Sequence, residues 1–193
     1  MDGVQAFKWT EKTAEGSDPD KCFDLAIGYA KGEGVPKNQV IASEYYRKAA
    51  EKGHMSAQYN LGIRYANGRG VEKNQAKAAE WYRKAAEQGH AKAQYNLAVS
   101  YVKGHGVPQD FKLAALWYQK AAEQGVSDAQ YSLSFVYEVG CGVPKNREQA
   151  IHWCRLAAEQ GSSDAKERLK KLLAERKSVH EAANCDGSYQ QAH

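Results

Sequence analysis

The sequence predicts an all-α protein, an α-solenoid built from 36-residue helix-turn-helix repeats. Three observations predict this fold: the repeats align without a gap, each closes on Ala-Ala-Glu-(Lys/Gln)-Gly, and eight of the 17 glycines form pairs in one register. A lone hairpin cannot bury its apolar side, so stacked neighbours must supply the core. The four complete repeats are residues 18–53, 54–89, 90–125 and 126–161.

The flanking segments continue the pattern for half a unit each. Residues 1–17 are predicted to hold a lone second helix, because Trp9 shares the register of the tryptophans in the later repeats. Residues 162–177 are predicted to form a lone first helix that caps the stack. Residues 178–193 have no periodicity and are expected to be a flexible tail.

In the second repeat, the first helix is expected over residues 56–66. Ala57, Leu61 and Tyr65 follow one another at spacings of four, which places them on one side of a helix. They are predicted to face the core, and their counterparts in the other repeats follow by adding or subtracting 36.

The loop and the second helix of this repeat follow from turn and capping residues. Gly68 and Gly70 permit positive φ and are predicted to end the first helix. Asn74 lies where an N-cap is needed. Trp81 is expected to fill the core of the second helix, and truncation of its counterpart Trp117 to Ala is predicted to cost about 3–5 kcal/mol.

A set of small, aromatic and glycine residues recurs in every repeat. In the second repeat the set comprises Ala57-Gln58-Tyr59-Asn60-Leu61-Gly62, Tyr65, Gly68, Gly70, Val71, Ala78, Trp81, Tyr82, Lys84-Ala85-Ala86-Glu87 and Gly89. The pattern resembles the Sel-1-like repeat, a relative of the tetratricopeptide repeat. The resemblance implies a right-handed α-solenoid that serves as a protein-interaction scaffold and contains no catalytic centre.

From this resemblance we expect a non-catalytic bacterial scaffold or adaptor that binds a partner peptide or protein in its concave groove. The alternative is an inhibitor or immunity-type protein that sequesters a bacterial toxin or cell-wall enzyme. Self-association, through the terminal repeats or an apolar patch, is a further alternative.

The groove is expected to be lined by the side of each first helix that is opposite its core side. There an aromatic, an amide and an aliphatic column run from repeat to repeat, which suits an extended peptide. The predicted binding residues are Tyr59, Asn60, Ile63, Tyr95, Asn96, Val99, Tyr131, Phe135, Arg168 and Lys171. The alternative for the tyrosines and asparagines is packing between adjacent first helices.

Two parts of this prediction depend on departures from the repeat. Phe135, together with Val102, Val136 and Val139, is expected to leave an exposed apolar patch, which usually indicates a contact surface. Arg168 and Lys171 belong to a highly charged helix. They are expected either to form the polar cap of the stack or to receive an acidic partner segment or a carboxylate.

Composition excludes several other classes of function. A net charge of +4 is too small and too dispersed for a nucleic-acid binder, and no apolar run approaches the roughly 18 residues of a membrane span. The start lacks an export signal, so a cytoplasmic protein is expected, or a periplasmic or secreted one if such a signal was removed. The four cysteines lie at unrelated repeat positions, which favours free thiols, and neither a metal nor a cofactor is expected.

Overall fold

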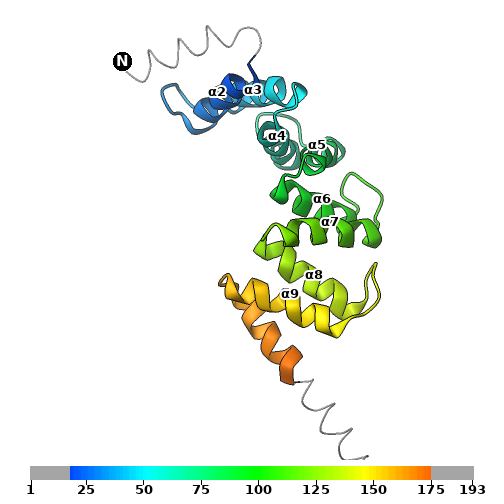
Figure 1. The fold of residues 1–193 in the computed structure, drawn as a ribbon. Helices are drawn as coiled ribbons and strands as arrows, with labels where there is room; N and C mark the ends of the chain where they lie inside the picture. The colour runs from blue at the N-terminus through cyan, green and yellow to red at the C-terminus, as the bar shows by residue number, and fades with distance from the viewer. Residues whose placement is uncertain (1–17, 175–193) are drawn as a thin grey trace, which may run out of the picture. The chain divides into compact units, whose positions relative to one another are not determined.

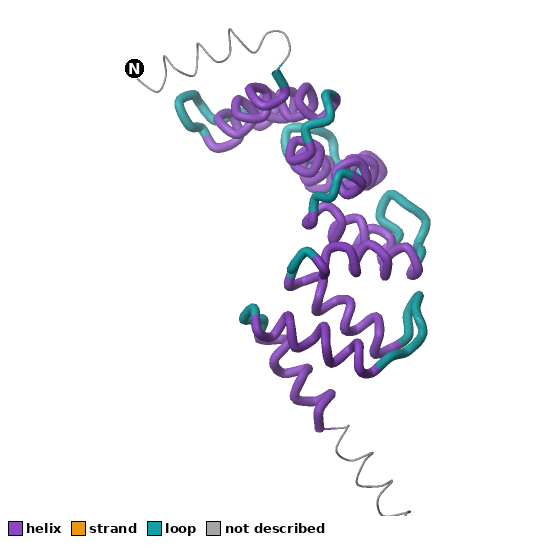
Figure 2. The backbone as a smooth tube through the Cα atoms, in the orientation of Figure 1, coloured by secondary structure: helices purple, strands orange, loops and turns teal. Residues whose placement is uncertain are grey.

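The computed structural model describes residues 18–174, and all regular structure in that range is helical (Figures 1 and 2). Residues 163–174 form the last described helix. The predicted half repeat 1–17, the end of the predicted capping helix and the predicted tail 178–193 lie outside the described residues. The preceding helices are α2 (Pro19–Lys31), α3 (Gln39–Glu51), α4 (Met55–Asn67), α5 (Gln75–Glu87), α6 (Ala91–Lys103), α7 (Phe111–Glu123), α8 (Ser127–Val139) and α9 (Arg147–Glu159).

These helices pair as the sequence predicts. Helix α2 packs along α3, α4 along α5, and α8 along α9, while α3 also contacts α4 and α5 contacts α6. The predicted all-α fold of repeated helical hairpins is thereby confirmed. Contacts divide the chain within α7 into two compact units, one ending at Trp117 and one starting at Tyr118. We refer to them as the first and the second unit and describe each by itself.

Capping residues fix the helix ends at the predicted positions. The first helix of each repeat ends at a glycine with positive φ: Gly32, Gly68, Gly104 and Gly140. The second helix of each repeat begins after a side chain that accepts backbone N–H groups: Asn38, Asn74, Asp110 and Asn146. Both sets of predictions are confirmed.

The second glycine of the loop allows a close approach between consecutive repeats. Gly70 has a φ of 69°, and a Cβ atom added there would overlap the backbone carbonyl of Gln39 at the start of α3. The loop of the second repeat therefore lies directly against the second helix of the first repeat. This contact forms one wall of the pocket described below.

The core differs from the prediction in its large aromatic residue. Ala57 and Leu61 are fully buried as predicted. In the second helix, however, Tyr82 is buried with 6% exposure, whereas Trp81 is half-buried with the Lys84 ammonium 4.0 Å from its ring centre. The tyrosine ring fits because Gly62 leaves room: a Cβ there would be 2.6 Å from ring carbons of Tyr82. Trp81 packs against the core cluster from its periphery, so the predicted core contact is present but the tyrosine is the buried ring.

A buried glutamine joins consecutive repeats. The Gln58 side chain is 5% exposed; its Nε2 donates to the carbonyl of Ala50, 3.1 Å away, and its Oε1 accepts from Gln88 Nε2 at 2.7 Å. We call this arrangement the glutamine joint. It ties the end of α3, the start of α4 and the end of α5 together. The donation to the preceding helix recurs from Gln94 to Ala86 and from Gln130 to Ala122.

Candidate functional site

In the first unit, the predicted aromatic column consists of Phe23, Tyr59 and Tyr95, and two of these rings pack against histidines that precede the next first helix. The Tyr59 ring stacks on His90 with centroids 4.3 Å apart, and Phe23 stacks on His54 at 4.4 Å. Burial raises the pKa of the Tyr59 hydroxyl, and a hydrogen bond with Asn96 lowers it by less. Tyr59 therefore contributes to packing between repeats, as the structural alternative expects, and keeps part of its surface accessible.

The two predicted groove asparagines have different partners. The Asn60 Nδ2 donates to the Ser56 carbonyl of the same helix at 2.8 Å. Asn96 instead hydrogen-bonds the hydroxyls of Tyr59 and Tyr82. Burial, and to a smaller extent the neighbouring Tyr59, raise the pKa of Tyr82 to about 12 despite that bond. Asn60 thus keeps its carbonyl oxygen as an acceptor, while Asn96 is engaged in the packing of the repeats.

An open pocket of about 660 Å³ lies in the first unit. It includes two of the predicted groove residues, Asn60 and Ile63, both half-buried. Tyr95 and Val99, also half-buried, are not among its lining residues. The lining consists of Ala30, Lys37, Gln39, Tyr46, Asn60, Ile63, Arg64, Gly68, Arg69 and Gly70.

Arg64 forms the buried wall of this pocket. Its residue exposure is 5%, and its Nη1 donates to the Gln39 carbonyl at 3.2 Å, to Ser43 Oγ at 3.1 Å and to the Arg69 carbonyl at 3.0 Å. Gln39 Oε1 accepts from both Nη1 and Nη2 at 3.1 Å. The guanidinium also lies 4.9 Å from the ring centre of Tyr46. Burial lowers the pKa of Arg64, and the nearby Tyr46 opposes that effect.

In the second unit, three predicted residues meet at a smaller cavity. Tyr131, Arg168 and Lys171 line a space of about 190 Å³ together with two acidic residues, Asp164 and Glu167. The Nζ of Lys171 is 3.1 Å from an Oε1 of Glu167. Acidic and basic groups therefore balance within this cavity.

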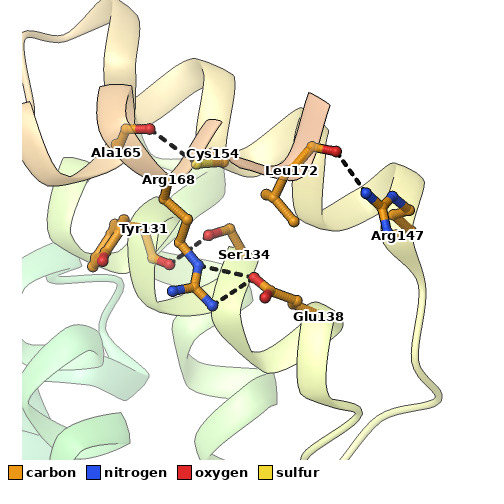
Figure 3. A network of polar contacts seen from close by, with 8 residues as sticks. All are labelled: Tyr131, Ser134, Glu138, Arg147, Cys154, Ala165, Arg168 and Leu172. Atoms are coloured by element: carbon orange, nitrogen blue, oxygen red, sulfur yellow. Dashed lines mark hydrogen bonds and ion pairs between the residues drawn. The ribbon is translucent and has the colours of Figure 1, made fainter. Parts of the chain in front are cut away.

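Arg168 is fixed by two contacts with α8, of which Figure 3 shows the pairing with Glu138. Its Nη2 lies 2.6 Å and its Nε 2.8 Å from Glu138 Oε2, so the guanidinium is paired within the chain. Its Cζ is also 5.0 Å from the ring centre of Phe135. The arginine thus joins the last described helix to α8, which fits the predicted capping role of that helix.

The predicted apolar patch is smaller than expected. Phe135 and Val139 are 48% and 49% exposed, but Val136 is 7% exposed because it points into the core. Val102 lies on α6 in the first unit. On α8 the exposed apolar surface therefore consists of Phe135 and Val139, one helical turn apart.

The cysteines and acidic residues give no sign of metal chemistry in the described part of the chain. Cys22 and Cys154 are buried and Cys141 is partly exposed, all three as free thiols. Cys154 Sγ donates to the Ala165 carbonyl at 3.2 Å (Figure 3), and burial raises the pKa of this thiol. Within residues 18–174, no three His, Cys, Asp or Glu side chains are placed to hold a metal ion, and no helix there is long and apolar enough to cross a membrane.

A family model of the Sel1 repeat matches residues 2–18, 22–54, 56–90, 91–126 and 127–162. The chain belongs to the Sel1 repeat family. Sel1 repeats generally mediate protein–protein interactions, and the scaffold they build is generally non-catalytic. The solenoid fold expected from the resemblance is that of the family.

Solved structures of Sel1 repeat proteins are similar to this chain. A protective antigen of uropathogenic Escherichia coli with an SLR fold is 37% identical, with a TM-score of 0.80 over 84% of this chain and 35% of that one. A Sel1 repeat protein from Oxalobacter formigenes is 36% identical, with a TM-score of 0.80 over 89% of this chain and 50% of that one. This chain thus spans half or less of the length of these two relatives. A comparison with curated proteins finds no match.

Sequence reasoning missed Arg64, although the Sel1 register contained a signal. The equivalent positions of the other repeats hold Gly28, Ser100 and Val136, so an arginine occurs there in one repeat alone. Its acceptor Ser43 also departs from the register, where the other repeats have Ala79, Ala115 and Ile151. Two coupled departures at one contact between repeats would have identified this pocket.

Proposed function

We propose that this Sel1 repeat protein is a non-catalytic scaffold that binds a segment of a partner protein on the first-helix surface of its first unit. The observation that carries the proposal is the open pocket of about 660 Å³, which brings Asn60 and Ile63 together with basic side chains. A concave site lined by a few polar groups and an apolar side chain is typical of ligand recognition.

The side chains of this pocket suit a peptide. The carbonyl oxygen of Asn60 is available to accept a main-chain N–H, because its amide nitrogen donates within α4. Ile63 adds an apolar contact next to it. Main-chain hydrogen bonds give affinity and side-chain contacts give specificity in such a complex.

Affinity purification of the full chain from its host, read by mass spectrometry, tests this proposal. The Asn60→Ala/Ile63→Ala double variant is expected to lose the partners that the parent protein retains. A matched control is Leu116→Ala, which truncates a 46% exposed apolar side chain of the second helix α7. Circular dichroism must show that both variants are folded.

The outcomes separate two surfaces. Loss of partners with the double variant alone supports the first-helix surface. Loss with Leu116→Ala, with retention by the double variant, moves the binding surface to the second helices and contradicts the proposal. A toxin or a cell-wall enzyme among the specific partners would favour the inhibitor or immunity-type alternative over a general scaffold.

A further inference from the structure

The charge of the pocket in the first unit is unbalanced. Lys37, Arg64 and Arg69 contribute three cationic groups to its lining, and no acidic residue lines it. None of the three forms an ion pair with a carboxylate of residues 18–174. A concave surface lined by charges of one sign concentrates ligands of the opposite sign.

Arg64 is the unusual member of the three, because its charge is buried. All its hydrogen-bond acceptors are neutral: backbone carbonyls, an amide oxygen and a hydroxyl. Buried charges in proteins are normally paired, since removing an ion from water is costly. Its Nε–H and one N–H of Nη2 have no acceptor among the described residues. The guanidinium therefore keeps both charge and donors for an incoming anion.

The acceptors hold this guanidinium in place at the edge of the pocket. Gln39 Nε2 donates to the Ala30 carbonyl at 2.9 Å, which orients its Oε1 toward Arg64. Ser43 Oγ donates to the Arg69 carbonyl at 2.8 Å and accepts from Arg64. An arginine whose rotamer is already fixed loses less conformational entropy when it binds a planar carboxylate.

We propose that this pocket binds the carboxylates of an acidic segment of the partner protein, with Arg64 as the buried anchor and Lys37 and Arg69 as exposed contacts. The inference rests on the proposed function and adds the chemistry of the partner. A peptide is favoured over a free anion because Asn60 and Ile63 lie in the same pocket. The Asn60 side-chain oxygen can accept a main-chain N–H of the peptide, and Ile63 offers an apolar contact.

Fluorescence anisotropy with a fluorescein-labelled hexaglutamate peptide tests the proposal on the full chain. We expect saturable binding that weakens with salt, and no binding of a labelled hexaserine peptide. The Lys37→Ala/Arg69→Ala double variant should bind hexaglutamate about tenfold more weakly, since two exposed charge pairs are lost. The matched control is Lys92→Ala/Lys103→Ala, which removes two exposed cations outside the pocket and should change the affinity less than about twofold.

Nuclear magnetic resonance tests the role of Arg64 without risk to the fold. The Nε–Hε resonance of Arg64, assigned by its absence in Arg64→Lys, should shift as hexaglutamate is added to the parent protein. An unshifted resonance at saturating peptide would overturn the buried anchor. Equal losses of affinity in the pocket variant and the control variant would overturn the pocket itself.

Inorganic phosphate distinguishes a peptide site from a small-anion site. If phosphate competes with hexaglutamate only at concentrations high enough to screen charges through ionic strength, the result supports binding of an acidic segment. Displacement of hexaglutamate by phosphate at concentrations too low to screen charge would instead assign the pocket to a small anion. If hexaglutamate does not bind while Asn60→Ala/Ile63→Ala still loses the native partner, the acidic chemistry is wrong and the proposed function stands.

Discussion

Two arginines on first helices, Arg64 in the first unit and Arg168 in the second, are held in opposite ways. Arg64 is 5% exposed and donates to neutral acceptors only. Arg168 pairs with Glu138 and covers part of Phe135. The presence of an arginine on a first helix therefore does not decide whether its charge is available to a partner. The carboxylate beside it decides, and Glu138 neutralises Arg168 within the chain.

The largest expected effect comes from removing the Arg64 side chain. Arg64→Ala should reduce the free energy of unfolding by about 2–4 kcal/mol, because several charge-assisted hydrogen bonds between repeats are lost. Urea denaturation followed by circular dichroism measures this. Ser100→Ala, at the equivalent position of the third repeat, is the matched control and should cost about 1 kcal/mol or less, because its hydroxyl bonds only within α6. Equal costs at the two positions would contradict a special role for Arg64.

A smaller effect is expected at Arg168. Arg168→Ala should cost about 1–2 kcal/mol, since it removes a partly buried ion pair and a cation–π contact. A double-mutant cycle with Glu138→Gln measures the coupling between the two side chains. Lys171→Ala, which removes an exposed ion pair from the same helix, should stay within about 0.5 kcal/mol of the parent protein. Coupling indistinguishable from zero would show that Arg168 is as available to a partner as Arg64.

Helix α8 of the second unit begins differently from α4 and α6 of the first unit. His54 and His90 cap α4 and α6 through Nδ1, whereas Val126 precedes α8 without a side-chain cap. Val126→Ser should therefore raise the free energy of unfolding by about 1 kcal/mol. Thermal denaturation at neutral pH detects it as an increase in Tm. A decrease would mean that packing of the valine outweighs the missing cap.

The smallest expected effect is a pH dependence of the first unit. Burial lowers the pKa of His90, and its Nδ1 accepts from the Ala93 N–H only in the neutral form. Because the folded pKa lies below the unfolded value of about 6.5, this stabilisation is present above pH of about 6.5 and is lost as the pH falls through the folded pKa.

His90→Asn separates this titration from other acid effects. Asparagine keeps a capping oxygen without a proton equilibrium in this range. The fall in Tm between pH 7.5 and 5 should be smaller in this variant than in the parent protein. Identical pH profiles would assign the acid sensitivity to other groups.

Much of the fold could be predicted because the end of each first helix and the start of each second helix are marked by the same kind of residue in every repeat. Asn74 and Gly68 were identified as cap and terminator because the same chemistry recurs every 36 residues, and the structure confirms both. The burial of Tyr82 instead of Trp81 could not be predicted, since both aromatics lie on adjacent positions of one helix. The difference follows from Gly62 on the facing helix, and only tertiary structure shows that approach.

The candidate site was less accessible to sequence reasoning. Asn60 and Ile63 were predicted from the helical wheel, and the pocket contains both. Arg64 was missed because the helical wheel places it between the core side and the groove side of the helix. The other repeats hold Gly28, Ser100 and Val136 at this position. The side-chain acceptors of Arg64 are Gln39 and Ser43 in the preceding repeat, so no pattern within a single repeat reveals them. The predicted binding roles of Tyr95, Asn96, Val99 and Tyr131 stay predictions.

The glutamine joint has a consequence for how such a chain can grow. The joints at Gln58 and Gln130 each reach eight residues back, to the end of the preceding repeat, and thirty residues forward, to the end of their own repeat. Because both reaches stay within fixed sequence distances, duplication of one 36-residue segment would recreate a complete joint at either boundary. Gene duplication can therefore lengthen this protein without redesigning any interface, which leaves single positions such as Arg64 free to diverge.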